Sequence, residues 1–439
     1  MRQYSSTSSL AWWNPFTSAS GASSRDGAAR VGSSPSGEGK DDARKIRERK
    51  DMFVALLATE FRRLSRLDPN MAREKLVDKA FEELEAKNLD EKTLMQMRHE
   101  LQNALQDQVV KIFQAFGSVD KNLPDPDQDH PQYDKILQEE YQYTLTELEN
   151  PTIQAPRGTS SKEYLTIKRG AIETLLDRRT QSQEEPLKSE VDDGVPKEVS
   201  WVDADNFGYH ETIDEEMNKQ IRHYQTVNMC RAAKLREELG YSVVALSSSI
   251  AGAGRGVFVD GYAKAGSILA FQPGLVWSKE HLVNLPIEVE KELEKNDKYQ
   301  MTLRPDDHLV DSRKSPYTVL TEENSNPLAL GHVVNHPTPS KPHNCKSIMV
   351  NFTQGMELGD LKRYIPNTYA RPRTLTIMGS LWDREAVDMH GMCLIATRDV
   401  CNEEVFYDYR LMTGHLPTWY HRVTDTDFAN PEEAVGENK

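Results

Sequence analysis

Hydrophobic positions in the first third of the chain recur at spacings of three and four residues, as on one face of an amphipathic helix. The pattern runs over residues 53–64, 76–84 and 101–113. Asp68-Pro69-Asn70 and the Leu-Pro-Asp-Pro stretch at 123–126 interrupt it, because proline removes a helical hydrogen-bond donor. We therefore expect three or four helices between residues 41 and 150, in a region that carries no catalytic residue.

The pattern changes twice further along the chain. Residues 151–208 contain Pro, Ser and Glu and are expected to form a linker. A last helix is expected over 209–240, with Gly240 as a favourable C-terminal stop. Short apolar runs separated by Gly, Pro and Asn then predict a β-rich domain over 241–422, and the tail 423–439 is expected to be disordered. The expected fold class is α+β, an N-terminal helical region followed by a β-rich domain of short strands.

The net charge of the chain narrows the classes of molecule that it is expected to bind. The chain has 439 residues, with 54 Lys and Arg against 69 Asp and Glu, so its net charge is -15. Nucleic-acid binding needs clustered basic residues and is not expected, whereas a basic protein substrate is compatible with this balance. No run of eighteen apolar residues predicts a membrane span.

The first 40 residues are rich in Ser, Gly and Ala and contain few acidic residues. This composition fits a mitochondrial or plastid transit peptide as well as an ordinary disordered leader. The compartment therefore stays open between an organelle and the cytoplasm or nucleus.

Four cysteines are scattered along the chain at positions 230, 345, 393 and 401, with no Cys-x-x-Cys pair. A disulfide framework and a four-thiolate zinc site both need closer groupings. We expect no metal site.

A glycine-rich turn lies near the start of the β-rich domain. Residues Gly252 to Gly256 lead into the β-branched run Val257-Phe258-Val259 and then into a second turn at 260–266. A dinucleotide-binding glycine loop must instead open a helix, whose N-terminus meets the phosphates. The order of elements predicts a β-hairpin and argues against a nicotinamide-dependent oxidoreductase.

Three further segments follow this turn in the β-rich domain. They are Tyr299–Asp311, Asn326–His336 with its continuation His343-Asn344-Cys345, and Val400–Leu411. Each has a plain structural explanation by itself: Asn335 can cap a turn, and Tyr409 can be a half-buried strand tyrosine. Their order and spacing together argue against coincidence.

Taken together, these segments resemble the motifs of the SET-domain methyltransferase superfamily. The glycine turn is similar to its GxG motif, residues 326–345 to its NHSC-like stretch, and 403–410 to its GEELTYDY-like strand. Residues 326–329 and 361–367 resemble the family of SET-domain-containing protein nine. The resemblance covers 241–422 and implies a knot-like C-terminal threading and an S-adenosylmethionine (SAM)-dependent protein-lysine N-methyltransferase.

Some positions depart from that family pattern. Pro337-Thr338 follows Asn335-His336 where most members read NHSC, and extra residues precede Asn344. Asn402 replaces the glycine before the Glu-Glu pair, although asparagine can still adopt a positive φ. The cysteine-rich zinc-binding flanks are absent, so Cys345, at a ligand position in zinc-bearing relatives, lacks partners. The alternative to an enzyme is a non-catalytic SET-fold interaction module with weak or no SAM binding.

The resemblance also implies a role for each matching residue. Tyr409 would place its hydroxyl beside the transferred methyl, and Tyr299 would line the lysine channel; these are the catalytic candidates. The candidates for cofactor binding are Ala253, Gly254, Asn335, His336 and Trp419. Trp419 would stack on the adenine, or else it anchors the tail to the domain core. The expected partners are a protein substrate, through a lysine side chain, and a protein bound by the helical half; no membrane partner is expected.

Overall fold

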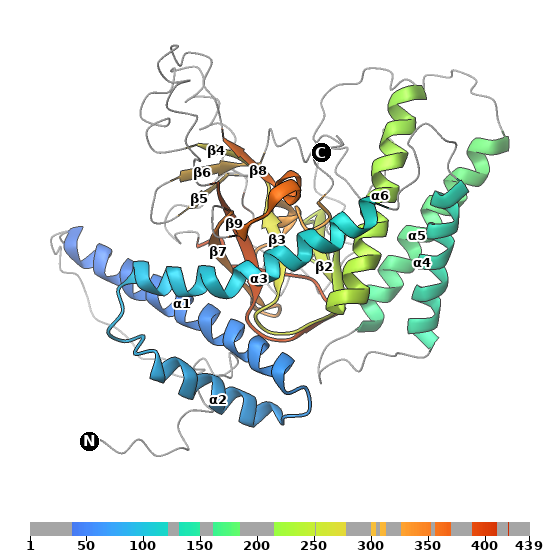
Figure 1. The fold of residues 1–439 in the computed structure, drawn as a ribbon. Helices are drawn as coiled ribbons and strands as arrows, with labels where there is room; N and C mark the ends of the chain where they lie inside the picture. The colour runs from blue at the N-terminus through green and yellow to red at the C-terminus, as the bar shows by residue number, and fades with distance from the viewer. Residues whose placement is uncertain are drawn as a thin grey trace, which may run out of the picture. The chain divides into compact units, whose positions relative to one another are not determined.

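The structure is a computed structural model that describes eleven stretches of the chain. These are residues 37–121, 131–149, 161–184, 215–250, 252–277, 300–303, 308–312, 326–352, 356–369, 389–410 and 420. The chain separates into two compact units, Met1–Arg47 and Glu48–Lys439. The second unit combines helices with small sheets of short strands, which confirms the α+β class (Figure 1).

Four helices occupy the region where three or four were expected. They are α1 (Gly37–Leu67), α2 (Arg73–Ala86), α3 (Leu94–Asp120) and α4 (Pro131–Glu149). α1 ends directly before the interruption at Asp68. Thr93 begins α3 with a capping box, in which its hydroxyl accepts from the Gln96 N–H while the Gln96 side chain accepts from the Thr93 N–H. The spacing of apolar residues and the break at Asp68 therefore agree with the structure, whereas the predicted break at 123–126 lies outside the described residues.

The linker expected over residues 151–208 contains a helix instead. α5 (Ser161–Glu184) presents Tyr164, Leu165 and Ile172 as buried side chains. The Pro, Ser and Glu residues at both ends of this range have the composition of a linker. The sequence therefore did not indicate the short apolar face between them. α6 (Glu215–Leu239) follows, and Gly240 ends it with φ +86° and an N–H bond to the Arg236 carbonyl, as expected.

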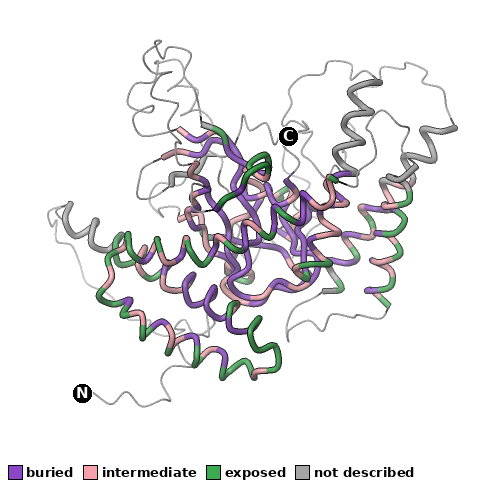
Figure 2. The backbone as a smooth tube through the Cα atoms, viewed as in Figure 1, coloured by how far each residue is buried: buried purple, intermediate pink, exposed green. Residues whose placement is uncertain are grey.

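The strands form three small sheets. The strands are β1 (Tyr241–Ser247), β2 (Arg255–Ala263), β3 (Ile268–Gln272), β4 (Gly274–Trp277), β5 (Gln300–Leu303), β6 (His308–Asp311), β7 (Cys345–Asn351), β8 (Asn367–Tyr369), β9 (His390–Ala396) and β10 (Val400–Cys401). Their orders are β1-β2-β10, β3-β9-β7 and β5-β6-β4-β8. Neighbouring strands are antiparallel except for the parallel pair β4 and β8. Buried positions gather in these strands and on the inward faces of the helices (Figure 2).

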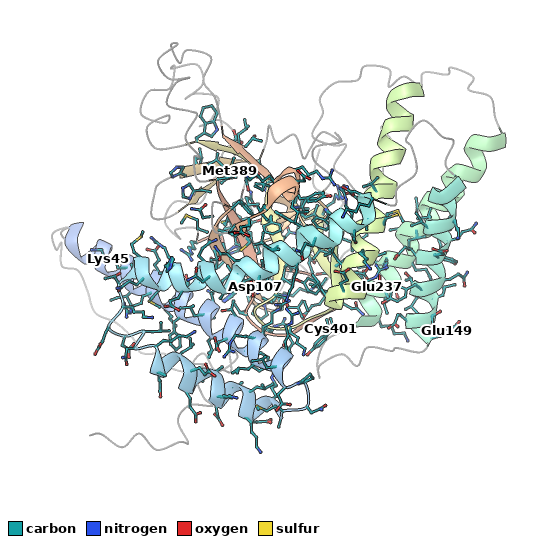
Figure 3. The ribbon with its side chains drawn as sticks, viewed as in Figure 1. Lys45, Asp107, Glu149, Glu237, Met389 and Cys401 are labelled. Carbon is teal, nitrogen blue, oxygen red and sulfur yellow. The ribbon has the colours of Figure 1, made fainter. Side chains whose placement is uncertain are left out.

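α3 packs across β3 and β7 and projects side chains toward them (Figure 3). Phe113 on its inner face contacts the rings of Phe271 and Phe352 with centroids 6.0 and 6.2 Å apart. Gln108 donates to the Gly266 carbonyl and accepts from the Ile268 N–H, so its amide satisfies backbone groups beside β3. The helix therefore supplies both apolar and polar cover for the strands.

Gln102 of α3 satisfies backbone groups of β7 in the same way. Its amide nitrogen donates to the Asn351 carbonyl at 2.7 Å, and its amide oxygen accepts from the Asn351 N–H at 2.9 Å. This reciprocal pair reproduces what a neighbouring strand would provide. α1 is equally close to the strands, since a Cβ built on Gly266 would lie 2.2 Å from the Ala58 carbonyl oxygen.

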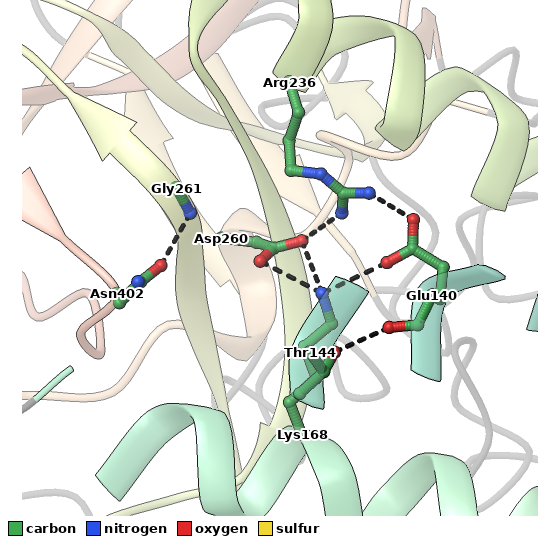
Figure 4. Close-up of polar contacts among 7 residues, drawn as sticks. All are labelled: Glu140, Thr144, Lys168, Arg236, Asp260, Gly261 and Asn402. Atoms are coloured by element: carbon green, nitrogen blue, oxygen red, sulfur yellow. Dashed lines mark hydrogen bonds and ion pairs between the residues drawn. The ribbon is translucent and has the colours of Figure 1, made fainter. Parts of the chain in front are cut away.

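A buried network of four charged side chains joins α4, α5 and α6 to β2. Lys168 of α5, which is 0% exposed, lies 3.1 Å from both Glu140 of α4 and Asp260 of β2 (Figure 4). Arg236 of α6 bonds the same two carboxylates from the other side. Two cations alternating with two anions satisfy charges that would be very costly to bury alone.

Burial would raise the pKa of the Asp260 carboxyl, but Lys168 and then Arg236 hold it well below its usual range. Burial would likewise lower the pKa of Arg236, but Asp260 and Glu140 raise it above its ordinary value. Asp260 and Arg236 therefore stay charged near neutral pH. The network therefore fixes the neighbouring helices α4 and α5 in one position on β2.

No helix within the described residues is both long and apolar enough to cross a membrane.

Removing the central cation of the network should destabilise the fold strongly. We expect Lys168→Met to lower the free energy of unfolding by about 3–5 kcal/mol, because two buried carboxylates lose one of the two cations that they share. Lys135→Met is the matched control on α4, where Lys135 and its partner Glu139 are 75% and 64% exposed. That variant should change stability by less than about 1 kcal/mol. Urea unfolding measures both, and equal losses would contradict the role given to the network.

Candidate functional site

The glycine turn connects β1 to β2, which pair antiparallel from Tyr241 opposite Gly261 to Ser247 opposite Arg255. This confirms the expected hairpin. Gly252 and Gly254 have φ values of +74° and +73°, which side chains with a Cβ rarely adopt. A Cβ built on either residue would meet no atom within 4 Å. The backbone of the turn is therefore uncovered and accessible to a ligand.

A buried carboxylate, Glu404, holds the turn from beneath. It accepts from the Ser248 hydroxyl at 2.7 Å, from the Ser249 N–H at 2.7 Å, from the Ser249 hydroxyl at 2.5 Å and from the Asn335 amide at 3.0 Å. A Cβ on Gly256 would lie 1.9 Å from Glu404 Oε1, so only glycine permits this approach. Glu404 was not among the residues that the sequence nominated. The only signal for it is the Glu-Glu pair before Tyr407-Asp408-Tyr409.

Asn335 is the second member of this hydrogen-bond system. Its amide nitrogen donates to the Arg255 carbonyl at 2.9 Å and to the Ser248 hydroxyl at 3.1 Å, besides Glu404. Its backbone carbonyl accepts from the Tyr407 N–H at 3.2 Å. A carbonyl oxygen has two lone pairs, so Asn335 retains capacity to accept from a ligand amine.

The segment from Glu403 to Tyr407 runs beside β2. The Val259 N–H donates to the Glu403 carbonyl at 2.9 Å, and the Val405 N–H donates to the Val257 carbonyl at 2.7 Å. At the turn before this segment, Asn402 has φ +47° and accepts from the Gly261 N–H at 2.7 Å. Asparagine therefore takes the positive φ expected where related proteins have glycine.

On its other side, the same segment contacts Asn344 and Cys345. Asn344 donates to the Glu404 carbonyl at 2.8 Å and accepts from the Phe406 N–H at 2.9 Å. The Cys345 thiol donates to the Phe406 carbonyl at 3.3 Å, and burial raises the pKa of this thiol, so it stays protonated. Cys345 thus holds the start of β7 against Phe406. The knot-like threading itself stays a prediction.

Tyr409 lies at the end of this segment, beside Asn335 and His336. Its hydroxyl donates to the Val334 carbonyl at 2.7 Å, and its N–H donates to His336 Nδ1 at 3.1 Å. The Tyr409 ring lies 5.1 Å from the His336 ring and 4.8 Å from the Tyr407 ring, centroid to centroid. The hydroxyl is therefore held in one direction.

Tyr420 adds an aromatic ring to the other side of His336. The two rings meet edge to face, with centroids 5.4 Å apart and an interplanar angle of 89°. Its neighbour Trp419 and the candidate channel residue Tyr299 lie outside the described residues. Sequence reasoning selected Trp419 from the aromatic pair, whereas the structure puts Tyr420 against a candidate cofactor-binding residue.

The additional residues after His336 form a compact turn. Thr338 and Lys341 exchange backbone hydrogen bonds of 3.1 and 3.2 Å. The Lys341 ammonium donates to the Ser249 carbonyl at 3.0 Å, directly before the glycine turn. The departure from the family pattern therefore provides another contact to the turn.

The contacts above bring the ends of the loop that carries Ala253 and Gly254 into one region with Asn335, His336 and Tyr409. Among the residues that the structure describes, no group of three or more His, Cys, Asp or Glu could hold a metal ion.

Comparison with known proteins gives little help in identifying this site. No family model matches the chain, and no curated protein matches it. One solved structure to which it is similar is CpSET8 from Cryptosporidium, with 11% identity over 56% of this chain and 97% of that chain. The TM-score of 0.24 is too low for the likeness to carry a functional argument.

Glu404→Gln tests the carboxylate beneath the turn. The amide would set its own N–H donors against the donors of Ser248, Ser249 and Asn335, so the free energy of unfolding should fall by about 1–3 kcal/mol. Glu403→Gln is the neighbouring control, since Glu403 is 19% exposed and pairs with Arg398 at the surface. Its loss should stay below about 1 kcal/mol. Chemical denaturation measures both variants. A larger loss of stability in Glu403→Gln than in Glu404→Gln would contradict the role given to Glu404.

His336 should make the stability of the site depend on pH. Burial lowers the pKa of His336 below its ordinary 6.5, while Asp408 opposes the shift, and Nδ1 can accept from Tyr409 only when unprotonated. Between the two pKa values the unfolded chain binds more protons, so this stabilisation is present above about pH 6.5 and lost as the pH falls through the folded value.

His336→Asn retains an acceptor for the Tyr409 N–H but does not titrate. The stability difference between the parent and this variant should be constant above about pH 7.5 and should shift against the parent below about pH 6.5. His343, whose pKa burial also lowers, is present in both proteins and largely cancels. Thermal melts across this range provide the measurement, and a difference independent of pH would exclude the proposed titration.

Proposed function

We propose that this chain is a SAM-dependent protein-lysine N-methyltransferase. The observation that carries the proposal is the hydrogen-bond system around Glu404 and Asn335. It joins the glycine turn, the Asn335-His336 pair and the segment that contains Tyr409, which are the segments that resemble SET-domain motifs. Unrelated strand and turn residues would have no reason to meet in this order and with these contacts.

The residues of this region fit the chemical groups of SAM. The uncovered backbone at Ala253 and Gly254 suits close approach of the methionine end, which side chains would obstruct. Asn335 offers acceptor capacity for an amino group, and the His336 backbone would meet the adenine edge. An aromatic ring near His336 suits stacking on a base, where tests give about 1–3 kcal/mol. SAM, when bound, supplies a methyl group on a positively charged sulfonium.

The chain itself must orient the lysine and keep it neutral. Lysine has an ordinary pKa of about 10.4, so its neutral form is scarce at pH 7 unless a narrow apolar channel disfavours the ammonium. Tyr409, held through its hydroxyl on the Val334 carbonyl, would direct the amine lone pair, and Tyr299 would line the channel. Good alignment of reacting groups is worth up to about 7–11 kcal/mol of the barrier.

The proposed substrate is a protein lysine, and the helical half is proposed to bind a protein partner as well. The net charge of -15 favours the approach of basic protein segments. The competing function is a SET-fold interaction module that binds SAM weakly or not at all. Measured SAM binding and methyl transfer separate the two.

Tyr409→Phe tests the proposed activity. Since the hydroxyl acts on transition-state geometry, kcat should fall on the order of 10²-fold while SAM affinity stays close to that of the parent. Labelled SAM and a lysate from cells lacking the protein provide the transfer assay, and calorimetry measures SAM binding.

Tyr262→Phe is the matched control. It removes a tyrosine hydroxyl that donates at the same 2.7 Å, to Asp399, outside the candidate site. This variant should retain the parental kcat. Equal activity of parent and Tyr409→Phe would remove Tyr409 from the reaction, and a parent that neither binds SAM nor transfers methyl would support the interaction module.

A further inference from the structure

A buried aspartate of the N-terminal helical region contacts the candidate site. Asp51 lies on α1 and is 8% exposed. Its Oδ2 is 2.6 Å from Arg410 Nη2, and its Oδ1 is 3.0 Å from Lys346 Nζ. One carboxylate thus binds two cations from distant parts of the chain.

Both cations belong to segments that build the candidate site. Arg410 directly follows Tyr409. Lys346 directly follows Cys345, whose N–H and thiol both donate to the Phe406 carbonyl. Asp51 therefore joins the segment that contains Tyr409 to β7, which begins at Cys345.

The backbone at Arg410 needs an external restraint. Its φ is +57°, a left-handed conformation that costs a residue with a Cβ about 1–2 kcal/mol. The Arg410 N–H donates to Asp408 Oδ1 at 2.8 Å, which closes a tight turn immediately after Tyr409. The side chain of Arg410 is anchored on Asp51, so the turn is held from both its backbone and its side chain.

The negative charge of Asp51 holds two positively charged side chains together. Without the Asp51 carboxylate, the positive charges of Arg410 and Lys346 would face each other at the edge of the site. His343 is close enough that Lys346, Asp408, Asp51 and His336 all influence its pKa, which burial lowers first. Charge-assisted hydrogen bonds are shorter and about twice as strong as neutral ones, so losing this pair would release the turn.

We propose that Asp51 is a positioning residue for Tyr409, through Arg410. α1 thereby becomes part of the reaction machinery, although none of its residues touches the reacting atoms. The catalytic consequence rests on the proposed methyltransferase function. The positional consequence, a fixed Tyr409 backbone, does not depend on it.

Asp51→Asn in the full chain tests both consequences, because it retains the shape of the side chain and removes its charge. Glu48→Gln is the control on the same helix. Glu48 is paired with Arg98 of α3 at 2.5 Å, and the two side chains are 16% and 14% exposed, comparable with Asp51 and Arg410 at 11% and 26%. Unlike Asp51, Glu48 forms no described ion pair with the segment that contains Tyr409.

Hydrogen exchange without any cofactor provides the first readout. Amides from Phe406 to Arg410 should exchange about tenfold faster in Asp51→Asn than in the parent, since local opening becomes easier. Glu48→Gln should leave them unchanged. If the two variants exchange alike over this segment, Asp51 does not position Tyr409.

Methyl transfer provides the second readout. In Asp51→Asn kcat should fall about tenfold while KM for SAM changes little, as for a loss confined to the transition state. Arg410→Gln combined with Asp51→Asn should lose no more than the larger single loss, because both act through one contact. An active parent with an unchanged kcat in Asp51→Asn would overturn the catalytic consequence. Faster exchange in a chain that never transfers methyl would instead reject the proposed function and retain the positioning.

Discussion

The buried Glu404 carboxylate is the interaction on which the candidate site depends. An acidic side chain that is 4% exposed is tolerated because hydroxyl, backbone and amide donors all converge on it. Those donors come from the glycine turn and from Asn335, so the carboxylate determines where both lie. Gly256 is required for the same reason, since any side chain there would displace the carboxylate.

The helices in the described part of the second unit are integral to the fold around this site. α3 satisfies backbone groups at β3 and β7 through two glutamines, and the network of Lys168 and Arg236 commits α4, α5 and α6 to β2. Short strands in small sheets leave many backbone groups and apolar faces to be covered. These helices provide that cover, and through Asp51 α1 also reaches the strand that carries Tyr409.

Sequence reasoning predicted those features that depend on neighbours along the chain. The helices of the N-terminal region, expected to number three or four, the break at Asp68 and the stop at Gly240 follow from local spacing and capping. The hairpin at the glycine turn was correct because glycines followed by a β-branched run have few alternatives. α5 was missed because its apolar face is short and its flanking residues have the composition of a linker. Glu404 was missed because the sequence does not show which of two adjacent glutamates, Glu403 or Glu404, is buried.

The sequence by itself therefore determined the fold class, the hairpin at the glycine turn and the motifs that nominated Asn335, His336 and Tyr409. It could do so because propensity, periodicity and motif spacing act over short stretches of chain. Only the tertiary structure decided which groups meet: Glu404 beneath the glycine turn, Tyr420 against His336, and Asp51 on Arg410. These contacts join residues separated by up to 359 positions, and their geometry arises only when the strands and helices pack around one core.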